Sequence, residues 1–257
     1  MDRTSISDIN YYKNAIKLAL NDDNIFNKFK TLPEYNVILE HASYNLGLEC
    51  LKNIKKNNSV LLNHINEFKE NDRYGGTIKF FYDEIGEISP NTLRYINVLS
   101  DFLSLNIDLN NKDIIEIGVG YGGQCLILSK YFNFKSYTLV DLIEPLELSK
   151  KYLELNNINN VFYKNMEDLE DGIYYDMVIS NYAYSECNKE VQDIYYDKIL
   201  KNSKNGYMIL NFISKIHNID SYSKDEIREK IPNSYFINEI PESSNNNIIL
   251  IWNKNKK

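Results

Sequence analysis

The sequence of 257 residues predicts an α/β protein: a doubly wound sheet of five parallel strands with a C-terminal antiparallel hairpin and an N-terminal helical cap. Two observations support this prediction. From residue 111 onward, short apolar runs alternate with stretches of helical spacing, whereas the chain before that point shows helical spacing. The last two apolar runs flank a loop rich in Pro, Ser and Asn, which is typical of a hairpin. We therefore predict a helical cap region in residues 1–110 and a sheet domain in residues 111–257.

The helices of the cap region are predicted from apolar residues that recur every three or four positions. This spacing covers residues 11–20, 37–54 and 60–68. A further helix is expected over residues 90–103, because Ser89 can cap a helix start and the proline after it suits the first helical turn.

The sheet domain is predicted from five apolar runs separated by helical stretches, an alternation that favours right-handed βαβ units with helices on both faces. The parallel strands are expected at residues 113–117, 137–140, 161–164, 176–180 and 207–212. The helices between them are expected at residues 122–132, 145–156 and 189–200. Two strands at residues 235–239 and 248–252 form the predicted hairpin.

Composition argues against several classes of partner. The formal net charge is −7, whereas proteins that wrap nucleic acid usually carry a basic face. No apolar stretch approaches the roughly 18 residues of a membrane span, and the first ten residues lack the apolar core of a signal peptide. The three cysteines are too far apart for a zinc site or a disulfide framework. We expect a cytoplasmic protein with a small-molecule acceptor, without nucleic acid, membrane or metal as partners.

A glycine-rich loop, Ile-Glu-Ile-Gly-Val-Gly-Tyr-Gly-Gly-Gln at residues 115–124, separates the first predicted strand from its helix. Glycines here let a ligand approach the backbone, and the helix start offers free N–H groups. Asp141 ends the second predicted strand, where a carboxylate can accept two hydrogen bonds from a ribose diol. The pattern predicts a cofactor that contains a ribose, either a nicotinamide dinucleotide or S-adenosylmethionine.

Three features favour S-adenosylmethionine. Glu116 lies directly before the glycine loop, where its charge would attract an ammonium and a sulfonium and would repel a pyrophosphate. The sheet ends in a hairpin, and a long helical region suited to covering a small-molecule site precedes it. A nicotinamide-dependent oxidoreductase and a non-catalytic cofactor-fold protein of surface-polysaccharide assembly are the alternatives.

The segment at residues 115–120 resembles the first motif of the class I S-adenosylmethionine-dependent methyltransferases, which have a Rossmann-like fold. Further segments narrow the resemblance: Ser-Pro-Asn-Thr-Leu-Arg-Tyr at 89–95, Tyr-Thr-Leu-Val-Asp-Leu at 137–142 and Ser-Asn-Tyr-Ala-Tyr-Ser-Glu-Cys at 180–187. Over roughly residues 70–215 the chain is similar to the sugar O-methyltransferase family of bacterial capsule and surface-glycan loci. The resemblance implies methyl transfer from S-adenosylmethionine to a sugar hydroxyl.

The resemblance also implies where the cofactor binds. The loop glycines would line its methionine half, Asp141 would hold the ribose, and residues 165–167 would border the adenine. The expected cofactor-binding residues are Glu116, Gly118, Gly120, Tyr121, Gly122, Gln124, Asp141, Leu142, Met166, Glu167 and Asn181.

The acceptor is expected beyond the fourth and fifth strands, because ligands of open parallel sheets bind at the carboxyl edge. A hydroxyl acceptor needs a base, for which Glu186 and His217 are candidates, and Tyr182 completes the expected catalytic set. The expected acceptor-binding residues are Tyr74, Arg94, Tyr95, Tyr184, Ser185 and Asn211. A phosphate-type oxygen is the alternative acceptor, since it is already ionised and needs a cation such as Arg94 rather than a base.

Overall fold

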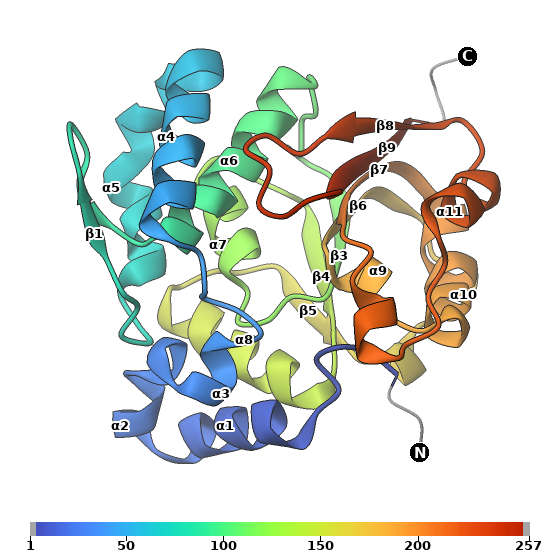
Figure 1. Cartoon of the computed structure of the whole chain (residues 1–257), viewed down its shortest axis with the longest axis horizontal. Helices are drawn as coiled ribbons and strands as arrows, with labels where there is room; N and C mark the ends of the chain where they lie inside the picture. The colour runs from blue at the N-terminus through green and yellow to red at the C-terminus, as the bar shows by residue number, and fades with distance from the viewer. Residues whose placement is uncertain (1–3, 254–257) are drawn as a thin grey trace.

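The computed structural model describes residues 4–253 and has a central seven-stranded sheet (Figure 1). The strand order is β5-β4-β3-β6-β7-β9-β8, in which β3 to β7 are parallel and β9 runs antiparallel to both of its neighbours. The strands are β3 (Asp113–Ile117), β4 (Ser136–Val140), β5 (Val161–Lys164), β6 (Tyr175–Asn181), β7 (Ser203–Leu210), β8 (Ser234–Asn238) and β9 (Ile248–Asn253). The prediction of five parallel strands followed by an antiparallel hairpin is confirmed.

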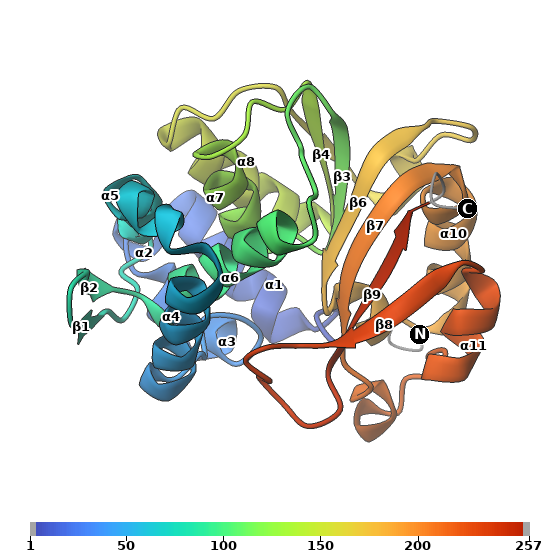
Figure 2. The same cartoon turned by 90° about the horizontal axis from the view of Figure 1, so that it is seen from above.

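Helices cover both faces of this sheet (Figure 2). One face carries α6 (Pro90–Ser104), α7 (Gly123–Ser129) and α8 (Ile143–Leu155), and the other carries α10 (Lys189–Lys198) and α11 (Lys224–Lys230). Side chains alternate along a strand, so each strand contributes to two cores. Ile114 and Tyr207 belong to the core under α6 to α8, whereas Ile115 and Met208 belong to the core under α10 and α11. The doubly wound arrangement is therefore confirmed.

The N-terminal helices pack on the face that carries α7 and α8 (Figure 2). They are α1 (Asn10–Asn21), α2 (Asp23–Phe26), α3 (Pro33–Asn36), α4 (Tyr44–Asn58) and α5 (Ile65–Phe68). A small hairpin of β1 (Phe80–Tyr82) and β2 (Gly86–Ile88), which the sequence pattern does not predict, precedes α6. Short 3-10 turns lie at Phe29–Thr31, Ser59–His64, Lys69–Asp72, Met166–Asp168, Leu200–Asn202 and Ser214–His217, and a single helical turn, α9, at Ala183–Glu186. The predicted helices at 11–20 and 90–103 are confirmed, whereas a 3-10 turn and α5 replace the one at 60–68.

The predicted helix at residues 37–54 is wrong in its first part. The helix α4 begins only at Tyr44, because Ser43 Oγ accepts a hydrogen bond from the amide of Leu46 at 3.2 Å and caps a new helix start. Residues 37–43 form a loop instead. Its apolar residues, Val37, Ile38, Leu39 and Ala42, line the cavity described below.

A buried polar cluster joins the N-terminal helices to the sheet domain. The Lys30 ammonium donates to the carbonyl of Asn71 at 2.7 Å and lies 4.0 Å from the ring centre of Tyr121 in the glycine loop. The side chain of Asn71 donates to the Tyr121 hydroxyl at 3.0 Å, and the Tyr152 hydroxyl of α8 donates to the Asn71 carbonyl at 2.6 Å. Because these groups are buried, the N-terminal helices and the sheet domain each supply hydrogen-bond partners that the other needs.

We expect residues 111–257, expressed alone, to aggregate, because Tyr121 and Tyr207 would lose ring contacts to Phe29 and Phe102 and expose apolar surface. Size-exclusion chromatography with light scattering, run beside the full chain, measures this. A monomeric fragment that unfolds cooperatively would contradict the prediction and would favour an independent domain beginning near residue 111.

Candidate active site

A cavity of about 1190 Å³ lies at the carboxyl ends of the parallel strands. It lies beside β3, where the order of the parallel strands reverses direction along the sheet. Open α/β sheets bind ligands at this kind of topological switch point. Segments after the strands contribute residues 116–120, 141–144, 165–167 and 181–183 to its lining. The N-terminal segment 4–7, the loop 37–43 and the loop 241–244 also contribute residues.

The glycine loop after β3 reaches the cavity in a conformation that requires glycine. Gly118 and Gly120 have φ angles of +76° and +55°, in the left-handed region that side chains disfavour. A Cβ on Gly118 would lie 1.9 Å from the Cβ of Ala183, the first residue of α9. The Gly118 amide also donates to the carbonyl of Val140 at 2.8 Å. The loop is therefore fixed between β4 and α9 with its backbone along the cavity.

Asp141, directly after β4, holds the glycine loop in place. Its carboxylate accepts hydrogen bonds from the amides of Val119 (2.7 Å), Gly120 (3.1 Å) and Leu142 (2.7 Å). Burial raises the pKa of Asp141 to about 6, although the three amides favour the ionised form. Asp141 also lines the cavity, and the ribose contact expected of it stays a prediction.

Glu116 brings a buried carboxyl group to the cavity. Only 2% of the residue is exposed, and the Tyr137 hydroxyl donates to the carboxyl at 2.7 Å. Burial raises the pKa of Glu116 to about 8, and the hydrogen bond from Tyr137 opposes that rise. The carboxyl is therefore largely protonated at neutral pH until a positive group approaches it.

Asn181, at the end of β6, offers the cavity a hydrogen-bond acceptor without a donor. Its Nδ2 donates to Gln124 Oε1 at 3.2 Å, and Gln124 Nε2 donates in turn to the carbonyl of Tyr95 at 3.3 Å. Asn181 Oδ1 is buried and has no hydrogen-bond partner within residues 4–253. Because an unpaired buried acceptor is costly, this atom suits a ligand that donates a hydrogen bond.

Tyr182 follows in an uncommon backbone conformation, with φ of +73° and ψ of −35°. Its hydroxyl donates to Glu239 and lies 3.0 Å from Ser243 Oγ, in the segment between β8 and β9. The guanidinium carbon of Arg94, on α6, lies 5.6 Å from the Tyr182 ring centre. The C-terminal hairpin and α6 thus meet at Tyr182, and strain of this kind is typical of functional sites.

Glu186, the last residue of α9, is a half-buried carboxyl in the cavity lining. Its Oε1 accepts a hydrogen bond from Asn211 Nδ2 at 2.6 Å. Burial raises the pKa of Glu186, and the Asn211 hydrogen bond and the charge of Arg94 counter part of the rise. The other expected base, His217, reaches the cavity from an exposed 3-10 turn after β7.

The structure brings most of the expected site residues together in this one cavity. Those in its lining are Glu116, Gly118, Gly120, Gln124, Asp141, Leu142, Met166, Glu167, Asn181, Tyr182, Glu186, His217, Arg94, Tyr95 and Asn211. Five expected residues lie outside the lining, namely Tyr74, Tyr121, Gly122, Tyr184 and Ser185.

Three of these five face the N-terminal helices and α8. The Tyr121 ring is buried in the polar cluster with Lys30, and a Cβ on Gly122 would meet Leu153 of α8 at 3.0 Å. Tyr74 packs its ring 6.3 Å from the ring centre of Tyr152. These residues support the site from behind rather than lining it.

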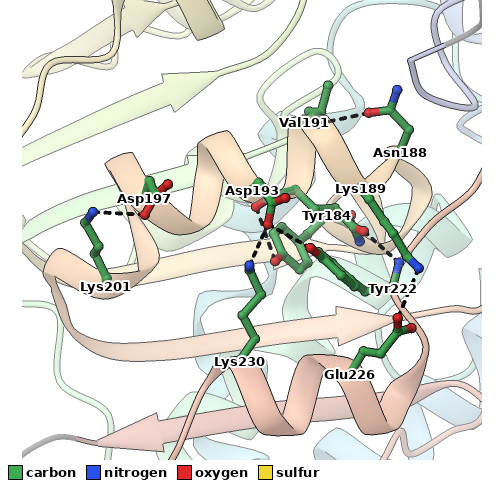
Figure 3. Close-up of polar contacts among 11 residues, drawn as sticks. Tyr184, Asn188, Lys189, Val191, Asp193, Asp197, Lys201, Tyr222, Glu226 and Lys230 are labelled. Atoms are coloured by element: carbon green, nitrogen blue, oxygen red, sulfur yellow. Dashed lines mark hydrogen bonds and ion pairs between the residues drawn. The ribbon is translucent and has the colours of Figure 1, made fainter.

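Tyr184 and Ser185 belong to the opposite core. The Tyr184 carbonyl accepts a hydrogen bond from Gln192 of α10 at 2.9 Å, and its ring lies under that helix (Figure 3). Ser185 Oγ donates to the carbonyl of Tyr182 at 2.8 Å and accepts from the amide of Asn211 at 3.0 Å. Ser185 thus fixes the backbone on both sides of the cavity edge.

Two walls of the cavity come from segments whose sequence predicts no part in the site. His41 lies in the loop 37–43, where burial, aided by the charge of Arg94, lowers its pKa. The N-terminal segment pairs with the end of α9, because the amide of Ile6 donates to the Glu186 carbonyl at 3.3 Å. Ser43, which can cap a helix start, is the sequence signal that the loop 37–43 precedes a helix. The segment 4–7 carries no local signal that it lines the cavity.

Within residues 4–253, His, Cys, Asp and Glu side chains nowhere form a group of three or more that could hold a metal ion. No helix in that range combines the length and the apolar character that crossing a membrane requires.

No family model matches the sequence. A Methanocaldococcus jannaschii protein named "Putative protein N5-glutamine methyltransferase" is 31% identical over 118 residues, which cover 44% of this chain and 58% of that protein. The match thus spans less than two thirds of the relative. Among solved structures, Thermoplasma acidophilum protein 1320 is 14% identical, with 74% of this chain and 98% of that chain covered and a TM-score of 0.46. An S-adenosylmethionine-dependent methyltransferase from Clostridium acetobutylicum is 10% identical, with 60% and 88% covered and a TM-score of 0.47.

The fold can be named from the structure's own features. A glycine loop follows the first parallel strand, Asp141 follows the second, and an antiparallel strand, β9, inserts between β7 and β8. The chain therefore has the Rossmann-like α/β fold of the class I S-adenosylmethionine-dependent methyltransferases.

Proposed function

We propose that this chain is a cytoplasmic S-adenosylmethionine-dependent O-methyltransferase that acts on a hydroxyl of a small sugar or glycan precursor in capsule or surface-polysaccharide biosynthesis. The observation that carries the proposal is the cavity itself. Glu116 and Asp141 lie in the same lining as Glu186 and Asn211, so the residues expected to bind the cofactor and to act as base share one cavity.

The residues at the strand ends fit S-adenosylmethionine. The unpartnered Asn181 Oδ1 and the buried Glu116 carboxyl suit its ammonium group. The glycine loop carries no side chains at Gly118 and Gly120, so the cofactor can approach the backbone there. Asp141 would meet the ribose, and Met166 and Glu167 would border the adenine. When bound, the cofactor supplies an electrophilic methyl group on a positively charged sulfur.

Glu186 then serves the acceptor. As the acceptor hydroxyl oxygen forms its bond to the methyl carbon, the carbon–sulfur bond breaks with its electrons on sulfur, and the hydroxyl proton passes to the Glu186 carboxylate. Its hydrogen bond from Asn211 orients the carboxylate, and its raised pKa makes it a better proton acceptor.

Two other acceptors fit particular observations. A phosphate-type oxygen would need no base and would use Arg94, which lines the cavity. An amide nitrogen would follow the name of the Methanocaldococcus jannaschii relative, and Asn181 Oδ1 could accept its N–H.

Calorimetry tests the cofactor first. S-adenosylhomocysteine should bind the full chain and NAD should not, whereas the reverse would favour an oxidoreductase and binding of neither would favour a non-catalytic role. Labelled methyl transfer to nucleotide sugars, sugar phosphates and glutamine-containing peptides then tests the acceptor. Transfer to the peptides alone would overturn the sugar proposal.

We expect cofactor binding to release a proton from Glu116. The free carboxyl has a pKa of about 8, and a bound ammonium favours its ionised form, so the affinity for S-adenosylhomocysteine should rise with pH below about 8 and level off above it. The limiting slope is about tenfold per pH unit. Calorimetry in buffers of different ionisation enthalpy counts the proton. Glu116→Gln should flatten this rise, and an unchanged rise in that variant would contradict the prediction.

A further inference from the structure

Arg94 differs from the other cationic side chain of the cavity. Of lysines and arginines within residues 4–253, Lys13 and Arg94 line the cavity, and Lys13 forms an ion pair with Asp8. Arg94, by contrast, has no carboxylate within 4.0 Å and no hydrogen-bond partner in this described part of the chain. Its charge is permanent, because guanidinium does not lose its proton in proteins.

The surroundings of Arg94 leave its donors free. Its guanidinium carbon lies 5.6 Å from the ring centre of Tyr182 and 5.9 Å from that of Tyr95. Ring contacts of this kind stabilise the charge but satisfy none of the five N–H donors. The charge of Glu40 also favours the guanidinium, but no carboxylate of residues 4–253 lies within 4.0 Å of it, so its N–H donors are available to a ligand.

Arg94 lies near the expected base, because its guanidinium faces the ring of Tyr182, which directly precedes the helical turn that ends at Glu186. The charge of Arg94 counters part of the rise in the pKa of Glu186 and, after burial, contributes to the lowered pKa of His41. The cavity, at about 1190 Å³, exceeds the 300–1,000 Å³ or so of ordinary ligand pockets and can take a second small molecule beside a cofactor.

We propose that Arg94 binds an acidic group, a carboxylate or a phosphate, on the acceptor, while a separate hydroxyl of the same molecule faces Glu186. A planar guanidinium between two rings pairs with such a group through two parallel hydrogen bonds. The inference rests on the proposed function for the identity of the site, and it narrows the acceptor to an acidic sugar or a sugar phosphate.

The test titrates the full chain, saturated with S-adenosylhomocysteine, with glucuronate, glucose 6-phosphate and glucose. Inorganic phosphate is titrated with and without the cofactor product. At least one of the two acidic sugars should bind about tenfold or more tightly than glucose. Tight binding of glucuronate indicates a carboxylate as the preferred group, and tight binding of glucose 6-phosphate indicates a phosphate. Arg94→Gln should remove that difference. Arg228→Gln is the matched control, because Arg228 also lies over a ring, 5.5 Å from that of Phe236 on the outer surface, and this variant should bind like the wild type.

Three outcomes would overturn the inference: acidic and neutral sugars binding alike, no binding of any anion, or Arg94→Gln weakening S-adenosylhomocysteine instead of the acidic probes. Thermal unfolding of each variant establishes that it is folded. Failure of the wild type to bind S-adenosylhomocysteine would instead count against the proposed function, and the cofactor-free phosphate titration would still decide the role of Arg94.

Discussion

Glu186→Gln should lower turnover by about 100-fold or more while leaving the affinity for S-adenosylmethionine unchanged. Glutamine keeps the shape of the side chain and can still accept the hydrogen bond from Asn211, but it cannot take a proton. Turnover is measured with the acceptor found in the methyl-transfer screen, and cofactor affinity by calorimetry. Glu190→Gln, the same change on an exposed residue of α10, should behave like the wild type.

The pH dependence of turnover provides a second readout. A base acts in its ionised form, and burial raises the pKa of Glu186, so the rate should rise with pH above the ordinary carboxyl range and then level off. The Gln variant should lose this rise. If Glu186→Gln keeps full activity while His217→Ala does not, the base is His217. If both keep it, the acceptor oxygen is already ionised.

Gly118→Ala should destabilise the folded chain by roughly 2–5 kcal/mol, the sum of a left-handed backbone penalty and an overpacked contact. The new Cβ would lie 1.9 Å from the Cβ of Ala183, and both backbones are fixed, one by the hydrogen bond to Val140 and the other at the start of α9. Urea unfolding of the ligand-free protein measures the loss.

A double variant separates the two contributions. Gly118→Ala with Ala183→Gly removes the contact between the two methyl groups and keeps the unfavourable φ, so it should recover about 1–3 kcal/mol of the loss. Ala183→Gly alone should cost at most about 1 kcal/mol. If the double variant is no more stable than Gly118→Ala, the close packing of the glycine loop on α9 is not what excludes a side chain.

The sheet was predictable because each of its strands is a local apolar run. Residues 113–117 and 161–164 agree with β3 and β5 at both ends, since both runs are bounded by polar residues and turns. The N-terminal part was less predictable. Apolar residues of the loop 37–43 line the cavity. From the sequence alone, apolar residues that line a cavity cannot be distinguished from those on the buried face of a helix. The hairpin of β1 and β2 is too short to show a clear alternation.

The residues of the candidate site were likewise predictable in part. Residues at the end of a strand or directly after it, such as Asn181 and Asp141, reach the cavity because strand ends fix their position. Tyr121 and Tyr184 each adjoin a residue of the cavity lining, Gly120 and Ala183, yet both side chains are buried in a core. Nothing local distinguishes them from the other tyrosines among the 21 of the chain. Which wall the segment 4–7 would form depends on contacts with residues 186–188, far away in the sequence.

That pairing has a consequence for synthesis of the protein. The amide of Asn188 donates to the carbonyl of Thr4 at 2.8 Å, and Ser243, near the other end of the described chain, lines the same cavity. During translation the segment 4–7 must wait until residues 186–188 have been added before its partner residues exist. Closing contacts so distant in sequence is slow, and incomplete chains expose apolar surface in the meantime. The full lining of the cavity therefore exists only after residue 247 has been added, and a ligand that binds there stabilises the folded chain against unfolding.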